Sequence, residues 1–437
     1  MKKLFAFIVV GFLCIAMFSM LVLAASQTAI NNQITGSISQ ETASGWWPMF
    51  HNSLTHDGFS PANGPDTNQT LWTYKTGGRV WSSPAVTDGV LFVGSFDNNM
   101  YALDATKGTY EWKFSTGGEI YTSPAVSDGI VYFGSNDHQV YALNAADGKL
   151  VWNYTTGKEV QSNPAVANGI VYVGSNDHNL YALNATNGFL IWSYPTGSTV
   201  ISSPTVDNGK VFFGSYDRNV YALDASNGKQ LWNYTTGSFV ESSPAIANGI
   251  LYIGSYDNHT YALDESTGKQ LWNFPETNDL CIQSSPAVAN GKVYIGSLDD
   301  NVYALDATTG TKLWNYKTGG PVYSSPAIAN NTIIVTSFDN KTYALDATTG
   351  NPIWTYQTGG NLYSSPATIC GVIYFGSYDN NIYAVAASTA TSPTPTATPT
   401  STSSSSINYA YVIGAVIIIL IIIAAAAVVL TRRRKHK

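Results

Sequence analysis

Residues 79–118 read RVWSSPAVTDGVLFVGSFDNNMYALDATKGTYEWKFSTGG, and this stretch decides the fold. It contains four short apolar runs, at Val80–Val86, Val90–Gly94, Met100–Leu103 and Tyr110–Phe114. Between the runs lie Asp, Asn, Thr and Gly residues, which accept tight turns and positive φ. Four strands separated by turns within 40 residues is the pattern of one propeller blade. Pro84 falls within the first run, which is tolerable if that strand is the edge strand beside a central channel.

This unit recurs along the chain with a period of 40 residues, apart from one step of 42. Three series of residues keep the period in one register. The tryptophans that end the units are Trp72, Trp112, Trp152, Trp192, Trp232, Trp272, Trp314 and Trp354. The Tyr-Ala pairs begin at Tyr101, Tyr141, Tyr181, Tyr221, Tyr261, Tyr303, Tyr343 and Tyr383. The prolines are Pro84, Pro124, Pro164, Pro204, Pro244, Pro286, Pro326 and Pro366. The sequence therefore predicts an array of eight equivalent units.

The two ends of the array complete each other. The run Leu71–Tyr74 has no unit before it, whereas the last unit stops after Asn381–Val385 without a Trp strand. Leu71–Tyr74 would fill that place as the outer strand of the last blade, and a closed ring leaves no open sheet edge there. The sequence predicts an all-β fold over residues 71–388, an eight-bladed propeller with four-stranded blades that is closed by its N-terminal strand.

A non-repeating segment, Trp46–Pro65, precedes the closing strand. We expect it to pack over the ring or beside the eighth blade. Its histidines, His51 and His56, are interpreted as packing or surface residues, and a role as metal ligands is the alternative.

Five units end in A-x-D-x-x-x-G-x-x-x-W, as in the stretch from Ala102 to Trp112, and the second and third units carry Asn144 and Asn184 at the Asp position. This pattern resembles the PQQ (pyrroloquinoline quinone)-type repeat, in which the Trp docks between neighbouring blades. The resemblance covers residues 71–388 and is degenerate in the eighth unit, where Ala386 stands at the Asp position. Propellers of this kind include quinoprotein dehydrogenases and non-catalytic, BamB-like assembly factors. The chain is also similar to archaeal membrane-anchored surface proteins with these repeats. Because proteins with such different functions share the repeat, the function has to be argued from the site.

The ends of the chain predict export and anchoring. Residues 1–25 hold two lysines and then an apolar run, the pattern of a signal peptide or an uncleaved signal anchor. Residues 26–70 form an N-terminal extension, and residues 389–408 a Thr/Ser/Pro-rich stalk. Residues 409–430 are uncharged and long enough for a transmembrane helix, and the basic tail 431–437 marks the cytoplasmic side. The sequence predicts a single-pass protein of the cell membrane with an extracellular propeller.

The charge of the exported part limits its partners. Seven of the 21 Lys and Arg residues lie in the two terminal segments, which leaves 14 basic against 28 acidic residues for the rest. Such a surface repels nucleic acid, so the expected partners are the membrane and a protein or glycan at the cell surface. N-x-S/T sequons predict N-glycosylation in an exported protein. The sequon asparagines are Asn68, Asn153, Asn184, Asn233, Asn258, Asn330 and Asn340.

No catalytic or cofactor site stands out in the sequence. The resemblance to quinoprotein dehydrogenases would imply a vicinal Cys pair and a calcium site around PQQ, but no two cysteines are adjacent. Cys281 and Cys370 are expected on opposite faces of the ring, two blades apart, so we predict no disulfide between them. His138 and His178 recur at one turn position, and His259 stands one residue further along in its unit; the aspartates of these turns are interpreted as turn formers. No cofactor or metal is predicted; PQQ, and weak calcium binding by the turns, stay alternatives that no site residue supports.

The units differ most at two positions of the first run. Five residues before the proline stand Arg79, Glu119, Glu159, Thr199, Phe239, Cys281, Pro321 and Asn361. Three residues before it stand Trp81, Tyr121, Gln161, Ile201, Glu241, Gln283, Tyr323 and Tyr363. Both series would ring one mouth of the channel, and aromatic side chains mixed with charges and amides suit a ligand or peptide pocket. The predicted binding residues are Arg79, Trp81, Glu119, Tyr121, Glu159, Glu241, Tyr323 and Tyr363.

These features favour a non-catalytic binding or scaffold module for a protein, a glycan or a component of the cell envelope. Two alternatives stay open: a quinoprotein-like oxidoreductase with an atypical site, and a structural protein of the envelope. For the mouth itself, sequence drift around a water-filled hole is the competing interpretation.

Overall fold

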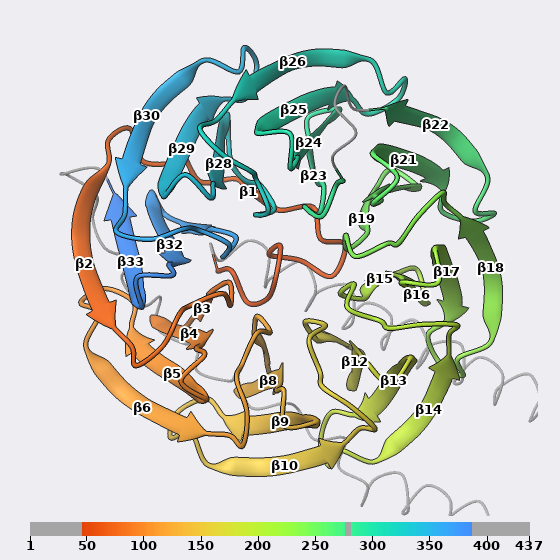
Figure 1. The fold of residues 1–437 in the computed structure, drawn as a ribbon. Helices are drawn as coiled ribbons and strands as arrows, with labels where there is room; N and C mark the ends of the chain where they lie inside the picture. Colours follow the sequence, from red (N-terminus) through yellow and green to blue (C-terminus); the bar gives the residue numbers. More distant parts are fainter. Residues whose placement is uncertain (1–45, 276–280, 387–437) are drawn as a thin grey trace, which may run out of the picture. The chain divides into compact units, whose positions relative to one another are not determined.

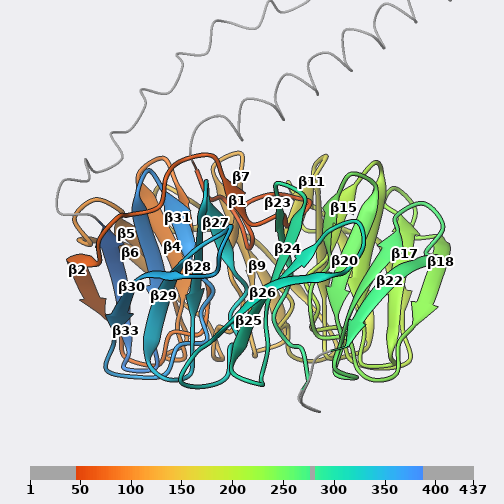
Figure 2. The ribbon, with the colours of Figure 1, turned by 90° about the horizontal axis from the view of Figure 1, so that it is seen from above.

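The computed structural model describes residues 46–275 and 281–386, which form a ring of eight β-sheets around a central axis (Figure 1). Seen from the side, the strands of each sheet run between the two faces of the ring (Figure 2). The fold class predicted for this part of the chain is confirmed. Within these ranges no helix is long and apolar enough to cross a membrane. The predicted signal, stalk, transmembrane helix and basic tail lie outside the described residues.

Each blade is built from four antiparallel strands, and the sheet of one blade has a fifth, parallel strand from the N-terminal segment. The innermost strands are β3 (Ala85–Thr87), β7 (Ala125–Ser127), β11 (Ala165–Ala167), β15 (Thr205–Asp207), β19 (Ala245–Ala247), β23 (Ala287–Ala289), β27 (Ala327–Ala329) and β31 (Ala367–Ile369). The second strands are β4 (Val90–Gly94), β8 (Ile130–Gly134), β12 (Ile170–Gly174), β16 (Lys210–Gly214), β20 (Ile250–Gly254), β24 (Lys292–Gly296), β28 (Thr332–Thr336) and β32 (Val372–Gly376). The third strands are β5 (Asn99–Asp104), β9 (Gln139–Asn144), β13 (Asn179–Asn184), β17 (Asn219–Asp224), β21 (His259–Asp264), β25 (Asn301–Asp306), β29 (Lys341–Asp346) and β33 (Asn381–Ala386). The outer strands are β6 (Tyr110–Ser115), β10 (Leu150–Thr155), β14 (Leu190–Pro195), β18 (Gln230–Thr235), β22 (Gln270–Pro275), β26 (Lys312–Lys317), β30 (Pro352–Gln357) and β2 (Gln69–Lys75). The short β1 (Phe59–Ser60) pairs in parallel with β27. Blades are numbered from the sheet of β3 as blade one to the sheet of β31 as blade eight.

Burial explains the composition of the strands. The second and third strands are covered on both faces by neighbouring blades, and they read as continuous apolar runs such as VLFVG and NMYALD. An outer strand such as β6 faces solvent and buries its tryptophan, Trp112, on the inner side. The hydrophobic core is therefore divided among the interfaces between blades.

Each outer-strand tryptophan docks on the following blade. The indole Nε1 of Trp112, in blade one, donates to the carbonyl of Ala145 in blade two at 2.8 Å. The ring of Trp112 lies against Gly148, which has a φ of 67° and no side chain in its way. The glycine of the repeat thus supplies both a left-handed turn and room for the indole. The docking of Trp between blades, which the resemblance implied, is confirmed.

Replacing Gly148 with alanine should therefore destabilise the protein far more than the same change at Gly129. Both glycines have positive φ, 67° and 72°, so both changes carry a backbone cost of about 1–2 kcal/mol. An added Cβ would lie 2.6 Å from the ring of Trp112 at Gly148, whereas at Gly129 no atom of the described residues lies within 4 Å. We expect Gly148→Ala to lose a further amount of about 2–3 kcal/mol in denaturant unfolding. Equal losses at the two positions would contradict this account.

The repeated turn aspartates hold the second hairpin against the neighbouring blade. Asp97 Oδ1 accepts the amide of Asn99 at 3.1 Å, as in an Asx turn. Its Oδ2 accepts the Tyr101 hydroxyl at 2.6 Å and the amide of Gly77 at 2.6 Å. Burial acts to raise the pKa of Asp97, but these hydrogen bonds outweigh it and lower the pKa. The prediction that these aspartates form turns is confirmed.

The ring closes as the sequence predicts. Strand β2 pairs antiparallel with β33, and Trp72 stands opposite Ala384. Blade eight lacks the glycine turn that receives the tryptophan of blade seven. The N-terminal segment replaces this turn: Trp354 Nε1 donates to the carbonyl of Pro65 at 2.7 Å. The N-terminal segment thus supplies both a strand and a docking turn to blade eight.

The first strand of each blade begins later than predicted. The sequence suggested Val80–Val86, but β3 covers Ala85–Thr87. Pro84 has no amide hydrogen, and the Ser83 amide turns toward the next blade, where it donates to Ser123 Oγ at 2.9 Å. The residues before Pro84 therefore bind across blades instead of extending the strand ladder.

The N-terminal segment 46–60, here called the plug, crosses the channel at one end (Figure 1). Of the two predicted placements, it lies over the ring. Its backbone carbonyls accept amides of the innermost strands in blades two, four, five, six and seven, and Trp47 bridges to Val86 in blade one. The carbonyl–amide pairs are Pro48–Val126, Leu54–Val206, Thr55–Ile246, Asp57–Val288 and Gly58–Ile328, with distances of 2.7–2.9 Å. His51 and His56 are buried in the plug as packing residues.

Candidate functional site

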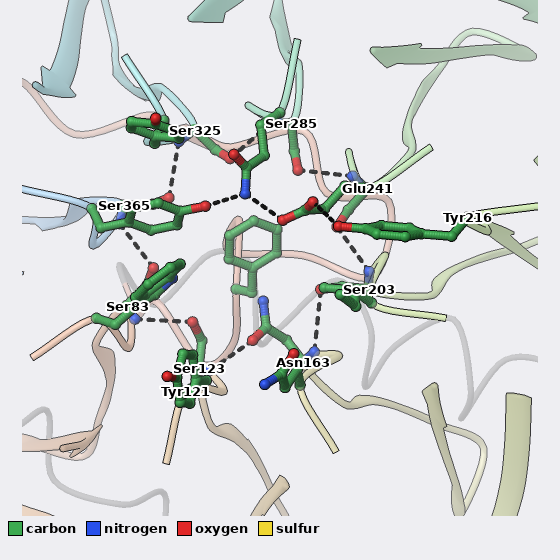
Figure 3. Close-up of a pocket in the computed structure, with 18 of the residues that line it drawn as sticks. Ser83, Tyr121, Ser123, Asn163, Ser203, Tyr216, Glu241, Ser285, Ser325 and Ser365 are labelled. Atoms are coloured by element: carbon green, nitrogen blue, oxygen red, sulfur yellow. Dashed lines mark hydrogen bonds between the residues drawn. The ribbon is translucent and has the colours of Figure 1, made fainter. Parts of the chain in front are cut away.

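A cavity of about 400 Å³ lies on the channel axis, with Phe50 of the plug among its lining residues and side chains of all eight blades around it. Figure 3 shows these side chains converging on the axis. Tyr216 and Tyr256 reach the cavity from the second hairpin turns, on the face away from the plug. The channel is thus a cup, with the plug as its floor.

A closed belt of hydrogen bonds surrounds the lower part of the cup. The residue before each proline is serine in seven blades and Asn163 in blade three, and each side chain accepts the backbone amide of the equivalent residue in the preceding blade (Figure 3). The eight donor–acceptor pairs are Ser83–Ser123, Ser123–Asn163, Asn163–Ser203, Ser203–Ser243, Ser243–Ser285, Ser285–Ser325, Ser325–Ser365 and Ser365–Ser83, at 2.6–3.3 Å. The belt satisfies the buried amides that stand before Pro84 and its equivalents. Because each hydroxyl here acts as an acceptor, its own proton can be offered to the cavity.

One side of the cup is an aromatic wall. It is built by Tyr323, Tyr363, Trp81 and Tyr121, from the consecutive blades seven, eight, one and two. Tyr323 stacks on Tyr363 at 4.8 Å between ring centroids, and Trp81 lies 5.2 Å from Tyr121. Phe96 packs behind the wall, with its ring 4.3 Å from that of Tyr121. These contacts hold the four rings beside the cavity.

The opposite side of the cup is polar and centres on Glu241 in blade five. Its carboxylate accepts hydrogen bonds from the hydroxyls of Tyr216 and Tyr256, the latter at 2.8 Å, and from the side-chain amide of Gln283. The same amide of Gln283 also donates to the Tyr363 hydroxyl, so a chain of hydrogen bonds joins Glu241 to the aromatic wall. Burial, and then the charge of Glu241, raises the pKa of Tyr216 and Tyr256 well above the usual value. Both tyrosines therefore remain protonated donors to the carboxylate.

Glu241 has no cationic neighbour in the part of the chain that the structure describes. The cavity lining contains no Lys, Arg or His. The ion pairs within 4.0 Å all involve other carboxylates, and the one nearest the mouth joins His138 to Glu159 at 3.8 Å. Arg79 lies over the Tyr378 ring, 5.1 Å from its centroid. The cup thus holds one carboxylate that no cationic side chain of the described residues contacts within 4.0 Å.

The structure divides the predicted mouth residues into two groups. Trp81, Tyr121, Glu241, Tyr323 and Tyr363 line the cavity. The remaining three, Arg79, Glu119 and Glu159, stand on the rim outside it. At these positions the backbone carbonyl accepts an amide of the second hairpin turn. The carbonyl of Arg79, for example, accepts the amide of Phe96 at 2.9 Å. These residues therefore pack against the hairpin turns and not along the channel wall.

The sequence-based prediction omitted several lining residues. Tyr216 and Tyr256 stand twelve residues after the proline of their blades, and Phe50 belongs to the non-repeating plug. The position twelve after the proline also varies among the blades, although less than the predicted ones. Its residues are Phe96, Asn136, Asn176, Tyr216, Tyr256, Leu298, Phe338 and Tyr378. A search for variable positions across the whole unit would have found this second series.

The predicted glycosylation asparagines differ in exposure. Asn153, Asn233 and Asn330 are exposed, whereas Asn68, Asn184, Asn258 and Asn340 are half-buried. The threonines of the Asn258 and Asn340 sequons, Thr260 and Thr342, are fully buried. In the folded protein, the three exposed asparagines are the most accessible acceptors.

The remaining polar groups singled out in the sequence are spread around the ring. Cys281 lies at the mouth beside Ile282, and Cys370 stands in the turn between β31 and β32 at the other face, as expected. Asp177, which neighbours His178, is engaged by Tyr181 and by the amide of Gly157. The described ranges contain no group of three His, Cys, Asp or Glu residues placed to hold a metal ion.

Two models of known protein families match parts of the chain. A family model described as the β-propeller of beta-alanine-activating enzyme matches residues 205–426, about half of the chain. A second model, described as outer membrane protein assembly factor BamB, matches residues 61–203. The protein is thus a propeller of PQQ-type repeats, and it belongs to the family of β-propellers that the first model describes. A comparison with curated proteins found no match.

Solved structures share the fold at low sequence identity. BamB from Moraxella catarrhalis is 19% identical, with a TM-score of 0.64, and the match covers 73% of this chain and 100% of that one. A europium-containing methanol dehydrogenase is 15% identical, with a TM-score of 0.71 and coverage of 80% and 100%. The quinohemoprotein alcohol dehydrogenase of Comamonas testosteroni is 15% identical, with a TM-score of 0.68 and coverage of 78% and 80%. At these identities the likeness concerns the fold alone.

The residues of the cup do not fit PQQ with a calcium ion. PQQ is a polycarboxylate, and its binding calls for cationic partners or a metal. The lining offers no cationic side chain and a single carboxylate, Glu241. The three cysteines, at positions 14, 281 and 370, cannot form a vicinal pair. The cup is therefore suited to a different kind of ligand.

Proposed function

We propose that this protein is a membrane-anchored surface propeller that binds a ligand, or a segment of a partner, in the cup without catalysing a reaction. One observation carries the proposal. The position three residues before the proline differs among blades that are otherwise closely alike, and all eight side chains at this position line the same cavity. Aromatic surface combined with a few placed polar groups is what binding pockets present.

The arrangement of these side chains argues against drift. Random replacement would scatter aromatic and polar residues around the ring. Here four aromatic residues occupy consecutive blades, and Gln161, Ile201, Glu241 and Gln283 occupy the other four. A partly buried carboxylate is costly unless hydrogen bonds support it, and Glu241 receives them from three side chains on three blades. Such a network is an organised feature of the cup.

The proposed location follows from the ends of the chain. An apolar segment at 409–430 followed by basic residues would anchor the chain with the propeller outside the cell. A propeller on a stalk at the surface can reach proteins, glycans and envelope components. We propose that one of these carries the group that enters the cup.

Removing two rings of the aromatic wall should strongly reduce the recovery of the partner. We expect the double variant Trp81→Ala/Tyr323→Ala to recover about one tenth of the wild-type amount of cross-linked partner from intact cells, because buried aromatic anchors dominate binding energy. The matched control is Tyr110→Ala/Phe189→Ala, which removes two aromatic side chains that are 52% and 73% exposed on the outer circumference. Equal recovery by the two variants would place the partner elsewhere and refute a role for the cup.

The quinoprotein alternative has its own test. The purified chain is mixed with PQQ and calcium, and cofactor absorbance and dye-linked oxidation of alcohols and sugars are followed. We expect no stoichiometric uptake. Uptake with turnover would overturn the proposal of a non-catalytic module.

A further inference from the structure

The charge inside the cup limits what can bind there. Glu241 is the one carboxylate among the described residues of the lining, and no cationic side chain of the lining faces it. Three neutral donors stabilise its carboxylate but do not cancel its charge. A ligand that brings a positive charge would complete the site, whereas an anion would meet a like charge in a partly desolvated space.

The aromatic wall adds to the same preference. The faces of Trp and Tyr rings attract cations within about 6 Å of the ring centroid, and the attraction grows when the cation is desolvated. Tyr363 joins the wall to the carboxylate, because Gln283 donates to both the Tyr363 hydroxyl and Glu241. The two attractive elements thus border one space.

The electric field of Glu241 reaches across the cup. Burial raises the pKa of Tyr363, and the charge of Glu241 is the next largest cause. In Tyr323 burial again comes first, and Glu241 is among the charges that raise its pKa further. A cation held against the wall would therefore interact with the carboxylate as well as with the rings.

The geometry points to an organic ammonium group as the ligand of the cup, held between the aromatic wall and Glu241. This inference rests on the proposed function and names the chemistry of its ligand. A volume of about 400 Å³ admits an alkylammonium or trimethylammonium headgroup, and Phe50 of the plug would form an apolar floor beneath it.

A sugar is the main competing class, because sugars also stack on aromatic side chains. The carboxylate of Glu241 favours an ammonium group over a sugar. A carboxylate has about four lone-pair positions, and three donors already occupy those of Glu241, so little capacity is left to bind sugar hydroxyls. Its charge, in contrast, acts on a cation without a further hydrogen bond.

The test measures binding of small probes to the full-length chain in detergent by calorimetry. Choline is compared with 3,3-dimethyl-1-butanol, its neutral isostere, and n-butylammonium and glucose form two further arms. We expect saturable binding of choline, with the neutral isostere at least about tenfold weaker. Binding of n-butylammonium alone would assign the site to primary amines, which is still an ammonium ligand. Equal binding of choline and its isostere, binding of glucose alone, or no binding of either cation would overturn the inference.

Two isosteric variants assign the charge to its residue. Glu241→Gln removes the charge within the cup, whereas Glu159→Gln removes one on the rim, so both change the net charge equally. We expect choline affinity to fall about tenfold in Glu241→Gln and to stay within about twofold of wild type in Glu159→Gln. Equal losses would indicate long-range attraction by the acidic surface and would refute the assignment. A thermal melt of each variant separates loss of binding from loss of the fold.

The outcomes also separate this inference from the proposed function. If partner recovery depends on Trp81 and Tyr323 but neither ammonium probe binds, the cup is a binding site for another chemistry. If partner recovery is unaffected by those residues, the proposed function itself fails.

Discussion

Deletion of residues 46–75 from the full chain, with residues 1–45 left in place, should abolish cooperative folding of the propeller. The deletion removes the plug and β2, so blade eight keeps three strands and β33 gains an open edge. Trp72 no longer covers Gly108, and Trp354 loses the carbonyl of Pro65. Loss of one buried tryptophan alone costs about 3–5 kcal/mol, which is comparable with the whole stability of many domains.

A second variant tests whether the missing strand is the cause. In the deleted chain, Ala386 is replaced by a copy of residues 346–357, DATTGNPIWTYQ, which in blade seven form the turn and the outer strand. This chain lacks the plug but regains a fourth strand on β33 and a glycine turn for Trp354. We expect it to recover a cooperative thermal transition and resistance to proteolysis, while the simple deletion shows neither. A deletion variant that melts cooperatively within a few degrees of wild type would show that closure contributes little.

The success of the sequence in predicting the ring has a local cause. The contact of Trp112 with Gly148 and the turn held by Asp97 recur in nearly every blade, so the same chemistry leaves the same residues at a fixed spacing. The missing outer strand of blade eight could be recognised in the sequence because one Trp strand precedes the first unit. Pro84 misled the prediction of the strand start, since the bond from Ser83 to the next blade has no counterpart within a single unit.

The placement of the plug over the ring was one of two predicted alternatives, but its contacts could not be predicted because they leave no side-chain pattern. It binds the innermost strands through backbone carbonyls, which every residue carries, and its segment occurs once. The same holds for the network around Glu241. Tyr216, Gln283 and Tyr363 come from three different blades, and only the closed ring brings them together. The aromatic and carboxylate positions could be identified by their variation, and their role as a ligand site stays a prediction.

The stability of the plug should depend on pH through its two histidines. His51 Nδ1 donates to the carbonyl of His56 at 3.1 Å, and its ring stacks on Phe50 at 4.5 Å. His56 Nδ1 lies 2.9 Å from Thr205 Oγ1. Since the Thr205 hydroxyl donates to the carbonyl of Pro244, the proton between the two groups belongs to His56. Both rings are buried, and burial favours their neutral form.

The sign of the effect follows from the pKa shifts. Burial lowers the pKa of His51 to about 4, and burial together with the charge of His51 lowers that of His56 to about 3. Below the ordinary value of 6.5 the unfolded chain binds protons that the native plug does not, so the free energy of unfolding falls as pH falls. The loss runs from about pH 6.5 down to the native values and reaches about 2.5 kcal/mol for each histidine near pH 4.5.

Asp57 acts in the opposite direction, because burial raises its pKa, and a carboxyl with a raised native pKa favours folding as pH falls. The Asp57→Asn variant should therefore steepen the pH dependence, whereas His51→Asn/His56→Asn should flatten it while lowering stability at pH 7. The measurement is the free energy of unfolding in denaturant between pH 7 and pH 4.5, together with hydrogen exchange of the amides of Val206, Ile246 and Val288. These amides donate to plug carbonyls, so they should lose protection before the strands of the blades do. Unchanged protection at pH 4.5, or an equal slope in wild type and the histidine variant, would show that neither histidine controls the plug.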